Sequence, residues 1–301
     1  MRASTHITKV SGIDLHWEEC GAGPCVVLLH GLTDWHRTWA PVASRIAERG
    51  FRVIALDMPG HGFSGRPDVS YTLSWNARIV GAWVDAVGID RFSAVGHSYG
   101  GGVAAMLSIT HAARIDHLAL VAPGGFGREV NLPIRVASVP YFLSMVGLGR
   151  IAKLTAPIGG RNNEDLEERA AVNSRPGSAR AVSRTLRDVI RWRGQVRYFL
   201  DHAYEAPFVP PMTLFWGEHD KVLPVAQAAR VADDLSGTRL VRFEASGHYP
   251  HHDEPERFTN ELERALRERA PKVTLPARDY SSAASASRTR PGAGKRSFAN
   301  A

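Results

Sequence analysis

The chain has 301 residues with a hydrophobic fraction of 44%, which is enough to bury a substantial core and excludes global disorder. No apolar stretch approaches the roughly 20 residues that a membrane-spanning helix needs, so we expect no stable membrane insertion. The formal net charge of +7 arises in two basic segments, 128–205 and 271–301, while the rest carries more Asp/Glu than Lys/Arg, so we expect no nucleic-acid partner.

The first 125 residues alternate short β-branched runs with amphipathic stretches, which is typical of an α/β domain built on a largely parallel sheet. In chain order we predict an opening hairpin and then four buried strands: 7–10, 13–18, 25–30, 52–57, 92–96 and 117–122. Apolar residues at helical spacing predict helices between them: 39–48, 73–87 and a third that begins at Tyr99. The alternation returns late in the chain, with strands at 212–216 and 239–244 and helices at 225–235 and 256–269.

Between Gly125 and Pro207 the strand pattern gives way to a helical, Arg-rich sequence that prolines interrupt. Long excursions in compact domains tend to be lids or binding segments, so we interpret residues 125–207 as a helical cap. The core is then predicted in two parts, residues 1–124 and 208–270. Within the cap four arginines recur at helical spacing, and such a row usually faces solvent: Arg180, Arg184, Arg187 and Arg191.

Residues 271–301 are rich in Ser, Ala, Arg and Gly and contain few apolar residues that could order them, so we predict a disordered basic tail. Two interpretations of this tail remain: a passive solubilising extension, or a tether to nucleic acid or membrane. Residues 1–9 lack the apolar core of a signal peptide, and Cys20 and Cys25 make no disulfide framework. We therefore expect a cytoplasmic protein, and the sequence leaves its oligomeric state open.

One pentapeptide, Gly96-His97-Ser98-Tyr99-Gly100, matches the pattern G-x-S-x-G between a predicted strand and a predicted helix. This context is that of a nucleophile elbow, a tight turn that exposes a serine hydroxyl. Glycines are needed on both sides of the turn because the strand and the helix approach too closely for side chains. We therefore predict that Ser98 is a catalytic nucleophile.

A serine hydroxyl needs a general base, and the base needs an acid that orients it. Open parallel sheets place their sites at the carboxyl ends of strands, and the two late strands are followed by Asp220 and His248. The order Ser, Asp, His predicts that His248 is the base and Asp220 the acid. The other candidate histidines lie beside the nucleophile, beside the acid or in other loops: His61, His97, His219, His251 and His252.

Acyl transfer also requires N–H donors for the developing oxyanion. One is predicted to be the backbone amide of Tyr99, and the second the amide of Leu32, in the loop that follows the strand 25–30. A metal held by the cluster of His248, His251, His252 and Asp253 would compete with the base. We therefore expect neither a metal nor a cofactor.

These motifs resemble the α/β-hydrolase superfamily over about residues 10–270, through His30-Gly31, the loop 57–62, the segment 96–101, Asp220 and Gly247-His248. The resemblance implies an α/β-hydrolase fold with a mostly parallel eight-stranded sheet flanked by helices, and a cap that shapes the substrate pocket. Residues 118–127 are similar to the segment that leads into the cap of serine-dependent C–C hydrolases, whose substrates are carboxylates. The resemblance implies substrate contacts for His30, Gly31, Arg169 and Tyr249, the last standing where those enzymes carry Trp.

The nucleophile restricts the chemistry, because a serine alkyl ether could not be hydrolysed whereas an acyl ester can. Ser98 therefore excludes alkyl halides and epoxides and implies a small-molecule carbonyl substrate. We predict a serine hydrolase of the carboxylesterase type. The alternatives are a C–C hydrolase of a carboxylate-bearing vinylogous diketone, a cofactor-free haloperoxidase or perhydrolase, and a non-catalytic small-molecule receptor on the same fold. The basic cap further predicts a preference for acidic substrates.

Overall fold

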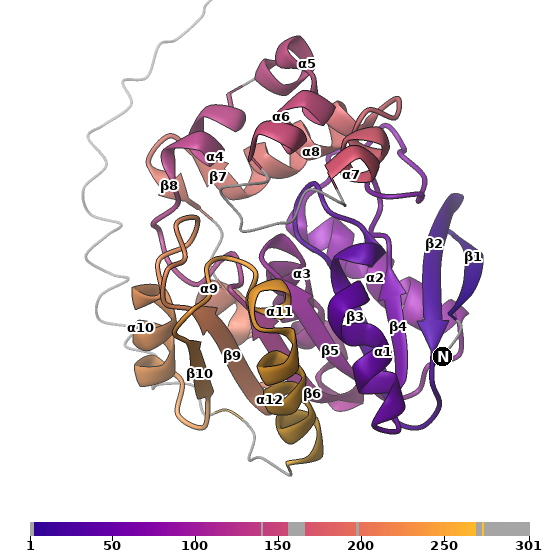
Figure 1. Cartoon of the computed structure of the whole chain (residues 1–301), viewed down its shortest axis with the longest axis vertical. Helices are drawn as coiled ribbons and strands as arrows, with labels where there is room; N and C mark the ends of the chain where they lie inside the picture. Colours follow the sequence, from indigo (N-terminus) through magenta and orange to yellow (C-terminus); the bar gives the residue numbers. More distant parts are fainter. Residues whose placement is uncertain (1–2, 140, 156–165, 197–198, 269–272, 274–301) are drawn as a thin grey trace, which may run out of the picture.

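The structure is a computed structural model that describes residues 3–139, 141–155, 166–196, 199–268 and 273. A single sheet of eight strands runs through its centre in the order β1-β2-β4-β3-β5-β6-β9-β10 (Figure 1). β1 pairs antiparallel with β2 and β2 antiparallel with β4, and all later neighbours are parallel. The strands are β1 (Ser4–Val10), β2 (Ile13–Cys20), β3 (Cys25–Leu29), β4 (Arg52–Leu56), β5 (Phe92–His97), β6 (Ile115–Val121), β9 (Met212–Gly217) and β10 (Arg239–Phe243).

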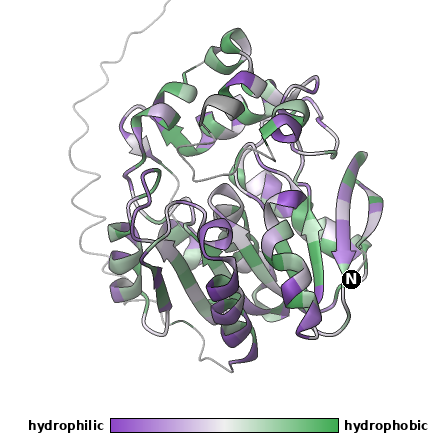
Figure 2. Cartoon of the chain, in the orientation of Figure 1, coloured by the Kyte–Doolittle hydropathy of each residue, from purple (hydrophilic) through white to green (hydrophobic). Residues whose placement is uncertain are grey.

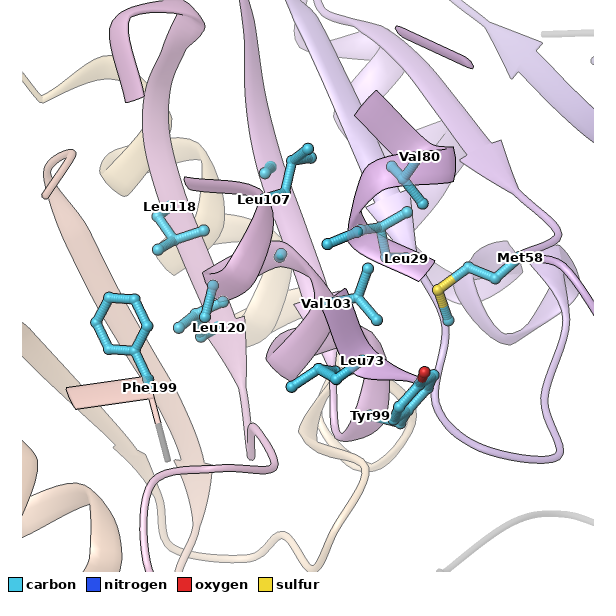
Figure 3. Close-up of a cluster of buried hydrophobic side chains, with 14 of the residues drawn as sticks. Leu29, Met58, Leu73, Val80, Tyr99, Val103, Leu107, Leu118, Leu120 and Phe199 are labelled. Carbon is cyan, nitrogen blue, oxygen red and sulfur yellow. The ribbon is translucent and has the colours of Figure 1, made fainter. Parts of the chain in front are cut away.

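Helices cover both faces of the sheet and enclose two apolar clusters. They are η1 (His36–Trp39), α1 (Ala40–Glu48), α2 (Leu73–Ala86), α3 (Tyr99–His111), η2 (Ala112–Arg114), α10 (Ala226–Asp234), α11 (Pro250–Asp253) and α12 (Pro255–Arg267). α1 and α12 pack on one face, whereas α2, α3 and α10 pack on the other, where Leu73, Val80 and Val103 meet strand residues such as Leu29 (Figure 3). The mostly parallel, eight-stranded α/β architecture predicted from the sequence is confirmed.

The amphipathic spacing of α12 shows why these helices form where they do. Phe258, Leu262 and Ala265 recur every three or four residues and are fully buried. Its remaining positions are largely charged, so the outward face is hydrophilic, in contrast to the apolar strands behind it (Figure 2). None of the described helices is both long and apolar enough to cross a membrane.

The described residues between β6 and β9 form helices that lie over the carboxyl edge of the sheet, within the segment 125–207 that we interpreted as a cap (Figure 1). Its helices are α4 (Leu132–Ala137), α5 (Phe142–Val146), α6 (Leu148–Thr155), α7 (Leu166–Asn173), α8 (Ser178–Val189) and α9 (Phe199–Ala203). The sequence predicted only helices here, but the structure adds a two-stranded hairpin, β7 (Ile190–Arg191) and β8 (Gly194–Gln195). Gly194, with φ of +118°, provides a backbone conformation that side chains rarely adopt, and this allows the tight return.

Most of the segment predicted as a disordered tail, 271–301, lies outside the described residues. Val273 is described, and it is 5% exposed and donates its backbone N–H to the carbonyl of Val209 at 3.1 Å. Val273, which falls inside the predicted tail, therefore packs against the core and forms an isolated antiparallel bridge with Val209.

Candidate active site

Ser98 lies in the turn between β5 and α3, with φ of +51° and ψ of −115°. A positive φ is uncommon for a residue with a side chain and persists only where the surroundings enforce it. Two glycines allow the turn: a Cβ at Gly96 would lie 2.3 Å from the carbonyl oxygen of Gly100, and a Cβ at Gly100 would lie 2.4 Å from the carbonyl oxygens of Leu29 and His30. The close approach predicted for a nucleophile elbow is thus present.

The structure brings together the three side chains that the sequence singled out. Nε2 of His248 lies 3.0 Å from Oγ of Ser98, and Nδ1 of His248 lies 2.8 Å from Oδ2 of Asp220. All three come from loops at the carboxyl ends of parallel strands, β5, β9 and β10. The three side chains predicted to serve as nucleophile, base and acid therefore form one continuous hydrogen-bonded chain.

Backbone amides orient the Asp220 carboxylate. Oδ1 of Asp220 accepts hydrogen bonds from the amides of Val222 and Leu223, at 2.8 and 2.9 Å, which leaves Oδ2 directed at His248. The loops that carry Asp220 and His248 approach each other closely: a Cβ at Gly217 would lie 2.1 Å from the carbonyl oxygen of Gly247. Glycine at 217 is therefore a packing requirement of the site.

Of the competing histidines, His97 lies nearest to the site but faces away from the nucleophile. Its Nε2–H donates to the backbone carbonyl of His248 at 2.9 Å, so it supports the loop of the base. Burial, and next the charge of His248, hold the pKa of His97 well below its ordinary value. His61 lies in another buried loop, where burial and next His30 lower its pKa to about 3.

Ser98 opens into a cavity whose lining comes from both the sheet domain and the insertion. The predicted oxyanion donors Leu32 and Tyr99 both belong to this lining. Tyr99 is the first residue of α3, so its amide has no acceptor within the helix. Most other lining side chains are apolar: Leu73, Val130, Ile134, Leu186, Val189, Ile190, Val222 and Leu223.

Gln195 is a polar residue of the cavity that the sequence analysis missed. Its Oε1 accepts from the amide of Gly125 at 2.7 Å, and its Nε2 donates to the carbonyl of Gly127 at 2.5 Å. The side chain thereby ties β8 to the chain leaving β6 and forms part of the wall beside Ser98. No motif marks this residue, because its role depends on a hairpin that the sequence did not predict.

His30 and Gly31, predicted as substrate contacts, pack inside the protein. His30 is fully buried, its Nδ1–H donates to the carbonyl of Gly31 at 2.8 Å, and its Nε2 accepts from the amide of Met58 at 3.0 Å. Both ring nitrogens are thus engaged by backbone groups and neither reaches the cavity. A Cβ at Gly31 would lie 2.8 Å from Nδ1 of His97 and 3.4 Å from Cβ of Ser98, so this glycine allows the loop to approach the nucleophile.

The two other predicted substrate residues, Arg169 and Tyr249, are also buried, at 4% and 6% exposure. Neither belongs to the described lining of the cavity. Instead both contact Asp34: Nε of Arg169 lies 3.3 Å from Oδ1, and the Tyr249 hydroxyl donates to Oδ2 at 3.2 Å. The buried carboxylate of Asp34 therefore already neutralises the cation that the sequence resemblance assigned to substrate binding.

The predicted arginine row does not lie on one helix, because α8 ends at Val189: Arg180, Arg184 and Arg187 lie on α8, whereas Arg191 lies on β7. Arg184 forms an ion pair with Asp68 and donates a hydrogen bond to the carbonyl of Val69. Nη1 of Arg180 lies 3.6 Å from Oδ2 of the same aspartate. Arg187 and Arg191 are exposed. Arg180 and Arg184 therefore dock α8 onto the core, and none of the four arginines belongs to the described lining of the cavity beside Ser98.

A second cluster of titratable residues, His16, His36 and Asp57, lies apart from the nucleophile and has the composition of a metal site. The Asp57 carboxylate already accepts from the amides of His36 and Phe63, at 2.6 and 2.8 Å. Burial alone would raise the pKa of Asp57, but hydrogen bonds from His16 and His36 outweigh it and hold the pKa well below its usual value. His36 bridges two carboxylates. Its Nδ1 lies 3.0 Å from Oδ1 of Asp57, and its Nε2 lies 3.3 Å from Oε1 of Glu18.

Because of these two carboxylates, the pKa of His36 is raised to about 9 although burial opposes its charge. The cluster is therefore best described as a buried ion-pair network that fixes the loop after β4.

Comparison with known proteins extends this description. Residues 24–255 match a family model described as alpha/beta hydrolase fold. The chain is 35% identical over 290 residues to an uncharacterized protein of Mycobacterium tuberculosis (91% of this chain, 83% of that protein). It is 31% identical over 264 residues to the 2-hydroxymuconate semialdehyde hydrolase of Pseudomonas sp. (strain CF600), covering 83% and 89% of the two chains. An esterase structure from Exiguobacterium antarcticum shares the fold, with a TM-score of 0.75 at 20% identity over 87% and 98% of the chains.

Proposed function

The chain belongs to the α/β-hydrolase fold family, and from this premise we propose that it is a serine hydrolase that cleaves a carbonyl substrate through an acyl-enzyme on Ser98. One observation carries the proposal: Oγ of Ser98 lies 3.0 Å from Nε2 of His248, whose Nδ1 lies 2.8 Å from Asp220. Such a chain lets the base remove the hydroxyl proton while the acid stabilises the imidazolium that results.

In the proposed first step, Oγ of Ser98 attacks the carbonyl carbon as Nε2 of His248 takes its proton, and one electron pair moves onto the carbonyl oxygen. The amides of Leu32 and Tyr99 donate to that oxyanion. When the tetrahedral intermediate collapses, the leaving group departs with the proton from His248. Water then attacks the acyl-enzyme with the same base, which restores the Ser98 hydroxyl and releases the acid.

The lining of the cavity supports a substrate whose body is apolar. Beside Ser98 the walls are formed mainly by aliphatic side chains of α2, α4 and α8 and of the loop that follows β9. Burial of apolar substrate surface against such walls is favourable at roughly 25 cal/mol per Å². We therefore propose a carboxylic ester with an apolar acyl or alcohol part, with the insertion serving as the cap that closes over it.

A second candidate reaction, hydrolysis of a C–C bond in a vinylogous diketone, is supported by the 31% identity to a relative named 2-hydroxymuconate semialdehyde hydrolase. The same nucleophile would attack a ketone carbonyl, and the departing carbon would leave as an enolate that must be protonated. The two candidates differ in the leaving group, so substrate turnover separates them.

We further propose that any acidic group of the substrate is recognised beside the β7–β8 hairpin. A hollow lined by Arg128, Arg191, Trp192, Arg193, Gln195 and Val196 adjoins the catalytic cavity, because Gln195 lines both. Within the described part of the chain, none of these three guanidinium groups has a carboxylate partner. A guanidinium without a carboxylate partner can bind a substrate carboxylate by two parallel hydrogen bonds, whereas Arg169 already faces Asp34.

A panel of p-nitrophenyl esters, thioesters and a vinylogous diketone, run against wild type and Ser98→Ala, tests the proposal. We expect ester turnover that Ser98→Ala abolishes while its melting temperature is unchanged. Turnover of the diketone alone would favour the C–C hydrolase. Tight binding without turnover of any substrate would overturn the enzymatic proposal in favour of a receptor.

A further inference from the structure

Asp34 lies at a junction of three segments that the proposed reaction requires. It belongs to the loop 31–34 that follows β3, and its carboxylate is 1% exposed. One oxygen faces Nε of Arg169 on α7 of the insertion, 3.3 Å away, and the other accepts from the hydroxyl of Tyr249, directly after the proposed base. A single buried carboxylate thus connects the insertion, the loop of Leu32 and the loop of His248.

Arg169 also binds the backbone of that loop. Its Nη2 donates to Oγ1 of Thr33 at 2.7 Å and its Nε to the carbonyl of Thr33 at 3.3 Å. Asn173, one turn further along α7, donates to the same carbonyl at 2.8 Å. Two side chains of the insertion therefore hold the one residue that follows Leu32.

Thr33 needs this support because its φ is +63°. A β-branched residue in the left-handed region is a conformational outlier, and such outliers persist only where neighbouring contacts enforce them. Release of Thr33 would let the loop relax toward ordinary backbone angles. The peptide units on either side of Leu32 would then rotate, and with them the amide proposed to donate to the oxyanion.

We propose that Arg169 is a positioning residue: through Asp34 and Thr33 it holds the oxyanion loop in its strained conformation and links that loop to the base through Tyr249. This inference rests on the proposed serine mechanism and deepens it. It also gives the insertion a second role, since docking of α7 would complete the catalytic geometry as well as cover the substrate.

The contacts of Arg169 oppose a direct role in substrate binding. Its guanidinium already faces a carboxylate and a threonine, and it lies outside the described lining of the cavity. A second anion would have to displace Asp34, which would leave a buried carboxylate without its cation, a costly state. Arg169 is therefore expected to act equally on charged and uncharged substrates.

The chain offers a matched control between the same two regions. Arg37 of η1 forms an exposed ion pair with Glu168, the neighbour of Arg169 on α7. Arg37→Gln removes a bridge between the core and α7 without touching Asp34 or Thr33. Surface ion pairs contribute little, so this variant should retain wild-type rates.

The experiment measures two rates in the full-length protein: phosphonylation of Ser98 by a fluorophosphonate, and turnover of a neutral and an anionic ester of equal size. Arg169→Met should slow phosphonylation and lower kcat for both esters by about 10²-fold with KM nearly unchanged. Arg169→Lys, which keeps the charge but loses the fork, should recover part of the rate. Tyr249→Phe, which removes one hydroxyl, gives a milder variant in case Arg169→Met does not fold. It should lower the rate of phosphonylation and the rate of ester turnover by the same factor.

The outcomes are distinguishable. A rise in KM for the anionic ester alone would make Arg169 a substrate-binding residue and overturn the inference. Unchanged phosphonylation in Arg169→Met and Tyr249→Phe, even with lower melting temperatures, would overturn it as well, because the network would then be merely structural. Failure of the wild-type protein to react with the fluorophosphonate would overturn the serine mechanism, and the positioning role with it.

Discussion

Nδ1 of His248 lies 2.8 Å from Oδ2 of Asp220, while the other oxygen of that carboxylate is occupied by two backbone amides. The geometry allows the imidazole only one orientation, with its N–H toward the acid and its lone pair toward Ser98. The loops after β9 and β10 thus carry the acid and the base to one point above the sheet.

Asp220→Asn should lower kcat by about 10⁴-fold, which is the loss seen in serine-protease triads when the acid becomes an amide. The amide preserves shape but stabilises the wrong imidazole tautomer. His248→Ala should be at least as damaging. Ester turnover in the two variants, measured beside His219→Ala, checks this, and a loss in His219→Ala as large as that in His248→Ala would contradict the choice of base.

Gly100→Ala should destabilise the protein by about 1–3 kcal/mol or more and abolish turnover, because its Cβ would lie 2.4 Å from two backbone carbonyl oxygens. Gly88→Ala is the matched control: it has open space for a Cβ but a φ of +68°. That control should cost roughly 1–2 kcal/mol through backbone strain alone and leave kcat unchanged. Urea denaturation and ester turnover measure both effects, and equal turnover in the two variants would argue against the elbow as the critical contact.

The ion-pair network around Asp57 predicts a pH window for stability. Because the folded state raises the pKa of His36 from 6.5 to about 9, its contribution is complete below about pH 6.5 and is lost as the pH rises through about 9. Because the folded state lowers the pKa of Asp57, the contribution of Asp57 to stability is present above about pH 4. It is lost as the pH falls toward the pKa of Asp57 in the folded state.

His36→Gln should therefore flatten the alkaline side of the stability profile. Because His36 is also one of the groups that lower the pKa of Asp57, the same variant should move the acid decline to higher pH. Melting temperatures between pH 4 and pH 10, for wild type and variant, check this. Parallel alkaline decline in both proteins would mean that His36 does not carry the effect.

Substrate charge should be sensed beside the hairpin and not on α8. Arg191→Gln with Arg193→Gln should reduce kcat/KM for an anionic ester at low salt and spare a neutral ester of equal size, because clefts of one charge attract opposite charges and salt screens the effect. Arg180→Gln, which removes an arginine that faces Asp68, is the control. Identical kcat/KM values for both esters at low and high salt would mean that the hairpin arginines serve only to solvate the insertion.

Much of the fold could be predicted because each signal is local. The eight strands are short β-branched runs, and α12 repeats apolar residues at helical spacing. Ser98, Asp220 and His248 could be selected because each lies in a polar or glycine-rich turn directly after a strand, and parallel strands bring such turns to one edge.

What could not be predicted depends on contacts between distant segments. Arg169 lies 135 residues from Asp34, and no pattern in the sequence indicates that the two charges meet. Each strand of the β7–β8 hairpin has only two residues, which is too short for an alternating pattern. Gln195, which lies on β8, could therefore not be recognised from the sequence. The same limit applies to Val273, whose pairing with Val209 depends on where the chain returns after α12.

The most direct test of the account is the site of covalent modification by a fluorophosphonate, read by peptide mass mapping. We predict one adduct, on the peptide that contains Ser98, absent in Ser98→Ala and formed far more slowly in His248→Ala. An adduct on another residue, or no adduct in the folded wild-type protein, would contradict the proposal that Ser98 is the nucleophile.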